Sequence, residues 1–167
     1  MADPTPIEIA SGEETISPET SRRVLQSLSF GCAVVSSEDW RILFENATFF
    51  QTFPNDGEAQ SLLSNRLPDF KVERAAERLQ AGRSYSYEVE AKIGARQVPI
   101  EVEVRPLTGS GEASLAVVEC RDISKRRQAE YMLESYSHMA EKNARELQRE
   151  KERVEKLLLN IMPRSVY

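Results

Sequence analysis

A stretch of about 38 residues, from Ser124 to Ile161, contains neither glycine nor proline and consists mainly of good helix formers. A helix of this length exceeds the usual globular range, so the pattern predicts a coiled coil. The predicted heptad seam has position a at Leu133, Ala140, Leu147, Val154 and Ile161, and position d at Ala129, Tyr136, Asn143, Glu150 and Leu157.

This seam predicts a parallel homodimer. Glu146 at position g and Lys151 at position e are placed for an ion pair between the two helices. The polar d residues Asn143 and Glu150 interrupt the apolar seam, which is typical of a register device or of a deliberately weak segment. The alternative is one long amphipathic helix that packs on its own domain.

The charge of the chain is distributed unevenly. Residues 1–123 hold 12 basic and 20 acidic side chains, whereas residues 124–167 hold 10 basic and 7 acidic ones. An acidic front part argues against a nucleic-acid partner. The basic run 125–127 is too short for the DNA-contacting helix of a basic leucine zipper.

The sequence has no apolar run long enough to cross a membrane and no signal peptide, so we expect a cytoplasmic protein without a membrane partner. Its two cysteines, Cys32 and Cys120, lie in apolar, strand-like runs. We therefore expect free buried thiols rather than a disulfide, and the spacing of the cysteines does not suggest a metal site.

Short elements alternate between the start of the chain and the long helix. Residues 1–18 have the composition of a disordered leader, and Ser17 with Pro18 predicts a helix start. A strand hairpin over 32–45 follows, and then a helix that Asn46 caps. Two further short helices are predicted, over 61–67 and 71–81, with Gly82 ending the second.

The apolar period then changes to two residues. Segments 85–92 and 98–105 alternate apolar and polar side chains, and 114–120 is a third long strand. Turns are predicted at Gly94 and over 108–111. The order β-β-α-α-α-β-β-β predicts an α+β fold, with a five-stranded antiparallel sheet, small helices on one face and a long C-terminal helix.

This order of elements resembles that of PAS domains over residues 20–127. The hairpin followed by Asn46-Ala47 resembles the family, and the most specific part is the end of the last strand. Family members there carry Asp-Ile-Thr followed by charged residues, and this chain carries Arg121-Asp122-Ile123-Ser124-Lys125-Arg126-Arg127.

The same motif is a candidate signal joint between domain and helix. A carboxylate at Asp122 can accept backbone N–H bonds where the long helix begins, and Arg126 or Arg127 can pair with it. An ordinary helix cap fits the motif equally well. The predicted joint consists of Asp122, Ile123, Ser124, Arg126 and Arg127.

A second resemblance lies at the end of the chain. Residues 154–163 are similar to the linker that enters the catalytic domain of class III nucleotide cyclases, with the pattern Leu-Leu-x-Asn-(Ile/Leu)-(Leu/Met)-Pro at 157–163. A helix end that Pro163 breaks is the alternative. The predicted domains are a leader at 1–18, a PAS-like sensor at 19–123, a coiled-coil signalling helix at 124–162, and the start of a linker to an absent output domain at 163–167.

No cofactor is predicted, although a small apolar ligand or a noncovalent flavin stays an alternative. His138, the one histidine, lies on the long helix at position f and is unsuited to ligate haem in a domain core. The cysteine motif of LOV flavin domains is missing, and both cysteines are on strands, unlike the chromophore cysteine of photoactive yellow protein. The candidate pocket lining is Val34, Phe44, Phe49, Phe50, Phe53, Leu62, Leu63 and Leu79.

Together these features predict a sensor and transmitter without catalysis of its own. The resemblances imply a PAS domain whose signal passes through a dimeric coiled coil to a covalently linked adenylate or guanylate cyclase domain. The alternatives are a dimerisation scaffold, or a PAS sensor for another output such as a histidine kinase. For a histidine kinase, Met139 replaces the acidic residue expected after the phosphoacceptor histidine.

Overall fold

A computed structural model describes residues 17–55, 57, 61–107 and 114–161 of the chain. Residues 1–16 of the predicted leader, Asp56, the 108–111 turn and the end of the cyclase-like pattern at 162–163 lie outside the described residues. The chain forms two compact units that divide between Asp122 and Ile123.

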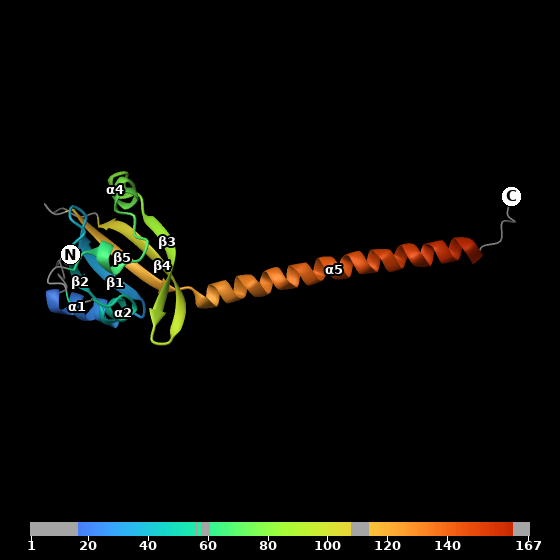
Figure 1. The fold of residues 1–167 in the computed structure, drawn as a ribbon, viewed down its shortest axis with the longest axis horizontal. Helices are drawn as coiled ribbons and strands as arrows, with labels where there is room; N and C mark the ends of the chain where they lie inside the picture. The colour runs from blue at the N-terminus through green and yellow to red at the C-terminus, as the bar shows by residue number, and fades with distance from the viewer. Residues whose placement is uncertain (1–16, 56, 58–60, 108–113, 162–167) are drawn as a thin grey trace, which may run out of the picture. The chain divides into compact units, whose positions relative to one another are not determined.

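The first unit contains five strands and four short helices, in the predicted order (Figure 1). The sheet is antiparallel throughout and has the strand order β2-β1-β5-β4-β3, so the last strand lies beside the first. Its elements are α1 (Pro18–Ser27), β1 (Gly31–Ser36), β2 (Ile42–Glu45), α2 (Ala47–Thr52), α3 (Leu63–Arg66), α4 (Val72–Gln80), β3 (Tyr85–Ile93), β4 (Arg96–Leu107) and β5 (Leu115–Asp122).

Strand alternation separates the two faces of the sheet. In β4, Ile100, Val102 and Val104 are buried in the core, whereas the intervening Glu101 and Glu103 point to the opposite face. In β1, Ala33 and Val35 belong to the same core, so Val34 between them points away from it. The period-two pattern predicted β4 over 98–105, and the observed strand extends two residues further at each end.

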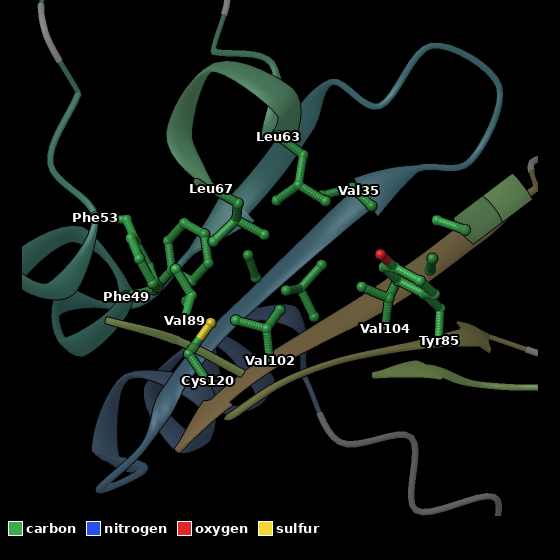
Figure 2. Packing of buried hydrophobic residues seen from close by; sticks show 14 of the residues in the cluster. Val35, Phe49, Phe53, Leu63, Leu67, Tyr85, Val89, Val102, Val104 and Cys120 are labelled. Atoms are coloured by element: carbon green, nitrogen blue, oxygen red, sulfur yellow. The ribbon is translucent and has the colours of Figure 1, made fainter. Parts of the chain in front are cut away.

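The core lies between one face of the sheet and helices α2, α3 and α4 (Figure 2). Phe49 from α2, Leu63 from α3 and Ala75 from α4 are each fully buried against strand side chains. Burying a side chain the size of leucine or phenylalanine contributes about 1.5–3 kcal/mol. The predicted α+β class, with small helices on one face of a five-stranded antiparallel sheet, is confirmed.

Two glycines end elements as expected. Gly82 has φ +69° just after α4, and Gly94 has φ +63° in the β3–β4 turn. Gly31 has a different role, because a Cβ there would lie 3.1 Å from the Cys120 Cβ and 3.2 Å from the Phe49 Cα. The start of β1 therefore needs glycine so that β5 and α2 can approach it.

The second unit is a single helix, α5 (Ser124–Ile161), of 38 residues (Figure 1). Its bounds coincide with the predicted stretch, so the long C-terminal helix is confirmed. None of its residues is buried. Among the described residues, no helix is long and apolar enough to cross a membrane.

Candidate functional site

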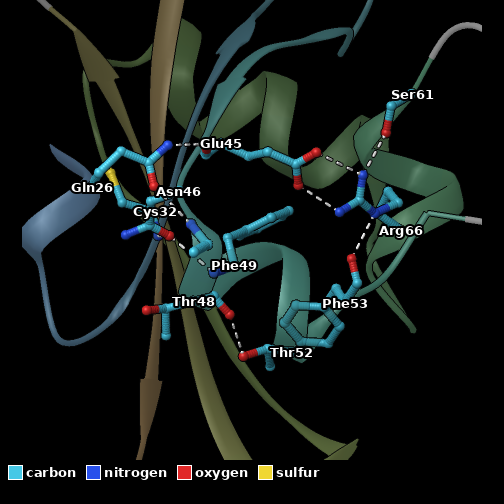
Figure 3. A network of polar contacts seen from close by, with 11 residues as sticks. Gln26, Cys32, Glu45, Asn46, Thr48, Phe49, Thr52, Phe53, Ser61 and Arg66 are labelled. Atoms are coloured by element: carbon cyan, nitrogen blue, oxygen red, sulfur yellow. Dashed lines mark hydrogen bonds and ion pairs between the residues drawn. The ribbon is translucent and has the colours of Figure 1, made fainter. Parts of the chain in front are cut away.

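Asn46 lies at the centre of a polar network that joins four segments of the first unit, and Figure 3 shows its contacts with Cys32 and Phe49. Its Oδ1 accepts from the backbone N–H of Phe49, which is the predicted helix cap, and from the N–H of Cys32, both at 2.9 Å. Its Nδ2 donates to the carbonyls of Leu25 at 3.1 Å and Phe30 at 2.9 Å. Both donors of this buried amide are therefore satisfied, and its oxygen accepts twice.

Gln26 adds a second connection between α1 and the rest of the unit. Its Nε2 donates to the Glu45 carbonyl, and its Oε1 accepts from the Ala47 N–H. Since α1 buries none of its own residues, these polar contacts and those of Asn46 are what fix the end of α1. The sequence predicted the cap but not the bonds of Asn46 to Leu25 in α1 and to Phe30 after it, which span 21 and 16 residues of chain.

Arg66 is a buried cation with a structural role that the sequence did not predict. Its guanidinium donates to both carboxylate oxygens of Glu45, at 3.2 and 2.5 Å, and to the Ser61 Oγ at 2.8 Å, while its Nε donates to the Phe53 carbonyl (Figure 3). The guanidinium carbon also lies 5.5 Å from the centre of the Phe49 ring. This pair holds α3 against β2 and α2. It leaves no uncompensated charge in that part of the domain.

The predicted pocket-lining residues do not form one site. Phe49, Phe53 and Leu63 pack together in the core, where their side chains contact one another and the sheet (Figure 2). Leu62 and Leu79 are half-buried, and Phe50 is 47% exposed. The other two, Val34 and Phe44, are partners in the β1–β2 ladder, and Val34 points away from the core.

An aromatic cluster lies at the other end of the core. Phe70 contacts Trp40 edge to face, with ring centres 5.1 Å apart, and packs against Tyr85 and Tyr87. The Tyr87 hydroxyl donates to the Pro68 carbonyl. Burial, with a smaller contribution from Cys120, raises the pKa of Tyr87 well above its usual value. Tyr87 is therefore neutral and structural at physiological pH.

Both cysteines are free and buried. Burial raises the pKa of the Cys120 thiol strongly, with a smaller effect from Cys32, and burial also raises the pKa of Cys32. The two side chains come from β1 and β5. Cys120 is part of the core cluster, whereas Cys32 precedes the core residue Ala33 and so points to the other face. Thiols with raised pKa values are poor nucleophiles, so neither cysteine has the character of a reactive group.

The outer face of the sheet carries one arginine–glutamate cluster. Glu119 in β5 is nearly buried and forms ion pairs with Arg105 of β4 and with Arg121. The Arg121 guanidinium also lies 5.1 Å from the centre of the Phe30 ring. The cluster ties the segment after α1 to the two central strands. Within the described residues, no group of three or more His, Cys, Asp or Glu side chains could hold a metal ion.

The predicted signal joint includes the end of β5 and the start of α5. Asp122 is the last residue of β5 and opposes Ile100 of β4, and Ser124 is the first residue of α5. The carbonyl of Ile123 accepts from the Arg127 N–H at 2.9 Å, which closes the first helical turn. Arg126 forms a surface ion pair with Glu130 at 3.7 Å. The signalling role of this joint stays a prediction.

The predicted seam of α5 is exposed along its length. Leu133, Leu147 and Ile161 at position a are 72–75% exposed, and the remaining seam residues are also exposed. Ion pairs lie on the surface of the helix, such as the one between Arg145 and Glu141 at 3.7 Å. His138 is exposed, like every other residue of α5. A row of large apolar side chains at heptad spacing in full contact with water is unusual unless a partner covers it.

No protein-family model matches the sequence, and no curated protein matches it. Among solved structures, an RNA-binding light-oxygen-voltage receptor is 17% identical over 82% of this chain, with a TM-score of 0.56. The match spans 41% of that receptor's own chain. A PAS domain from a two-component sensor histidine kinase is 18% identical over 62% of this chain and 94% of its own (TM-score 0.44). The PAS domain of Bordetella pertussis BvgS is 18% identical over 72% of this chain and 96% of its own (TM-score 0.42). At such identities the likeness is one of fold alone, and the described strands and helices of the first unit have a PAS-like arrangement.

Proposed function

We propose that this chain is a sensor and transmitter module, in which the PAS-like unit passes a signal through a parallel α5 homodimer to a class III nucleotide cyclase domain. The observation that carries the proposal is the exposed a/d seam on an unbroken helix of 38 residues. The resemblance of residues 154–163 to the cyclase linker supports the choice of output.

The seam supplies a plausible driving force for pairing. Full burial of each leucine, valine or isoleucine contributes about 1.5–3 kcal/mol. Association costs roughly 4–15 kcal/mol before any gain appears. Leu133, Leu147, Val154, Leu157 and Ile161 from each chain, together with Tyr136, are enough to exceed that cost when two helices pair along the seam.

The polar d positions suit a helix pair that has to switch. In a parallel dimer each Glu150 would face its counterpart, and like charges there weaken that layer of the seam. In the single helix Glu150 lies 3.8 Å from Arg153, so part of its charge is already compensated. A seam that is weak at the two layers of Asn143 and Glu150 lowers the cost of moving between two registers.

A dimerisation scaffold is the second candidate. The observation that favours it is that Phe49, Phe53 and Leu63, three of the predicted pocket-lining residues, are packed in the hydrophobic core. In that case the PAS-like unit would sense nothing, and α5 would only hold two chains together. A histidine kinase output stays a less favoured alternative, because Met139 follows His138.

The test is a fusion of residues 1–167 to a cyclase catalytic domain, with residues inserted after Glu141. Seven inserted residues restore the heptad phase, so basal cyclase activity should stay near that of the uninserted fusion. Insertions of two to five residues rotate the seam and should change activity markedly. A smooth decline of activity with length, whatever the phase, would make α5 a tether and favour the scaffold.

A further inference from the structure

An open cavity of about 610 Å³ lies between α4 and the ends of β1, β4 and β5. Ligand pockets in proteins usually have volumes of about 300–1,000 Å³. Only Leu79 is shared with the pocket predicted from the sequence, so this cavity is a different place from the filled core. Its walls consist of Ser37, Glu38, Trp40, Val72, Glu73, Ala76, Leu79, Gln80, Pro106, Leu107, Ser114 and Leu115.

Most of the wall is apolar. Val72, Ala76 and Leu79 follow one face of α4 at helical spacing, and Leu107 and Leu115 are direct partners in the β4–β5 ladder. Strand alternation from the core residues Val104 and Ala116 places Pro106 on the α4 side of the sheet, whereas Leu107 and Leu115 point to the opposite face at the rim of the cavity. Such a wall favours a hydrocarbon or aromatic body, because transfer of that surface out of water is favourable.

The charged residues of the wall are all acidic. Glu38 lies in the β1–β2 connection and Glu73 in the first turn of α4, and no lysine or arginine is among the described residues of the lining. Two carboxylates beside an apolar surface attract a cation and repel an anion. The cavity therefore complements a ligand that joins an apolar body to a positive charge.

The Trp40 side of the cavity is held in an uncommon backbone conformation. Trp40 has φ +59°, although it is a bulky residue, and its neighbour in the aromatic cluster, Phe70, follows Asp69 with φ +57°. The Trp40 N–H donates to the Ser36 carbonyl, and its own carbonyl accepts from the Leu63 N–H at 2.8 Å. Strained backbone of this kind persists where the surroundings fix it, and it is concentrated at ligand clamps and switches.

We propose that this cavity binds a small organic amine, with an aromatic or aliphatic body against the α4 and β4–β5 walls and its ammonium group beside Glu38 and Glu73. The proposal does not depend on the nature of the output domain. Binding here would bridge α4 and the β1–β2 connection, which the hydrogen bonds of Trp40 join to Ser36 of β1 and to Leu63 of α3.

The test uses Trp40, which is the only tryptophan of the chain and part of the cavity wall. Phenethylamine and phenylacetate have the same ring and opposite charges, and each is titrated into the full chain. The fluorescence of Trp40 and the NMR signal of its indole N–H report binding. The amine should produce a saturable change and bind roughly tenfold or more tightly than the acid, since two carboxylates favour a cation.

Two sets of variants locate the site. Glu38→Gln combined with Glu73→Gln should weaken amine binding several-fold, whereas Glu77→Gln on the same helix, outside the lining, should leave it unchanged. Ala76→Phe should fill the cavity and abolish the response. The proposal is overturned if the amine gives no saturable change, if the acid binds equally well, or if the double glutamine variant binds the amine as the wild type does. The glutamine variants change surface groups only, so they keep the test decisive even if Ala76→Phe does not fold.

Discussion

Replacing Asn46 with aspartate should destabilise the PAS-like unit far more than the loss of a helix cap would. Aspartate is as good an N-cap as asparagine, so the bonds from the Phe49 and Cys32 N–H groups can persist. The two Nδ2 donors are lost, however, and a buried carboxylate oxygen then faces the carbonyls of Leu25 and Phe30.

The magnitude follows from these contacts. A lost neutral hydrogen bond costs about 1 kcal/mol, and leaving a buried acceptor unsatisfied costs about 1–3 kcal/mol. We expect Asn46→Asp to lower the free energy of unfolding by about 2–4 kcal/mol, a large share of the 5–15 kcal/mol typical of a domain. Ser17→Ala is the matched control, because the Ser17 hydroxyl caps α1 through the Thr20 N–H and makes no bond outside that helix. It should cost about 1 kcal/mol or less.

The assay is urea unfolding followed by Trp40 fluorescence, at one protein concentration for all variants. Hydrogen exchange should also become faster in α1 for Asn46→Asp, because the bonds to Leu25 at the end of α1 and to Phe30 just after it are both lost. A loss no larger than that of Ser17→Ala would refute the reasoning, since it would mean that the bonds to Leu25 and Phe30 contribute nothing.

Three further predictions concern the seam, the start of β1 and the thiols. Leu147→Lys combined with Val154→Lys should convert the proposed dimer to monomers in sedimentation, because several kcal/mol of buried contact is lost and like charges face each other; an unchanged dimer would place the interface elsewhere. Gly31→Ala should lower the free energy of unfolding by about 1–3 kcal/mol, because its Cβ would crowd Cys120 and Phe49, while Ser29→Ala, at an exposed neighbour, should change little; equal effects would count against the close approach. Cys32 and Cys120 should react with a thiol reagent at pH 8 slowly in the native chain and rapidly in urea, because burial raises both pKa values and blocks access; fast native labelling would contradict this.

Local rules predicted the elements well, since each is determined by nearby residues. The cap at Asn46, the glycine ends at 82 and 94, and the period-two strands all depend on neighbours within a few positions. The uninterrupted run from 124 to 161 likewise fixed both ends of α5. These features need no knowledge of which segments meet in space.

The candidate pocket lining was harder to predict, because it depends on which face each side chain takes. Phe49 and Phe50 are adjacent in sequence, yet one is fully buried and the other is 47% exposed, since successive helical residues point about 100° apart. Val34 lies in an apolar run, but Ala33 and Val35 are the residues that enter the core. Choosing between them requires the register of β1 with its neighbours.

Arg66 and Trp40 could not be predicted at all from local patterns. An arginine is expected at the surface, and only the arrival of Glu45, Ser61 and the Phe53 carbonyl from other segments makes its burial possible. Trp40 occupies a turn position with positive φ, where small or polar residues are the usual choice. The burial of Arg66 and the backbone conformation of Trp40 both depend on contacts with segments that lie elsewhere in the sequence.

Cysteine cross-linking along α5 tests the central claim, a parallel homodimer in the a/d register, most directly. Val154→Cys places a thiol at position a, where two parallel helices bring it next to its counterpart, and Glu152→Cys places one on the outer face at position f. The native thiols of Cys32 and Cys120 are buried and should form no disulfide between chains. On mild oxidation at low micromolar concentration, the Val154→Cys chain should become a covalent dimer, and the Glu152→Cys chain should not. Equal cross-linking of the two, or none at position 154 in a chain that sediments as a dimer, would contradict the account.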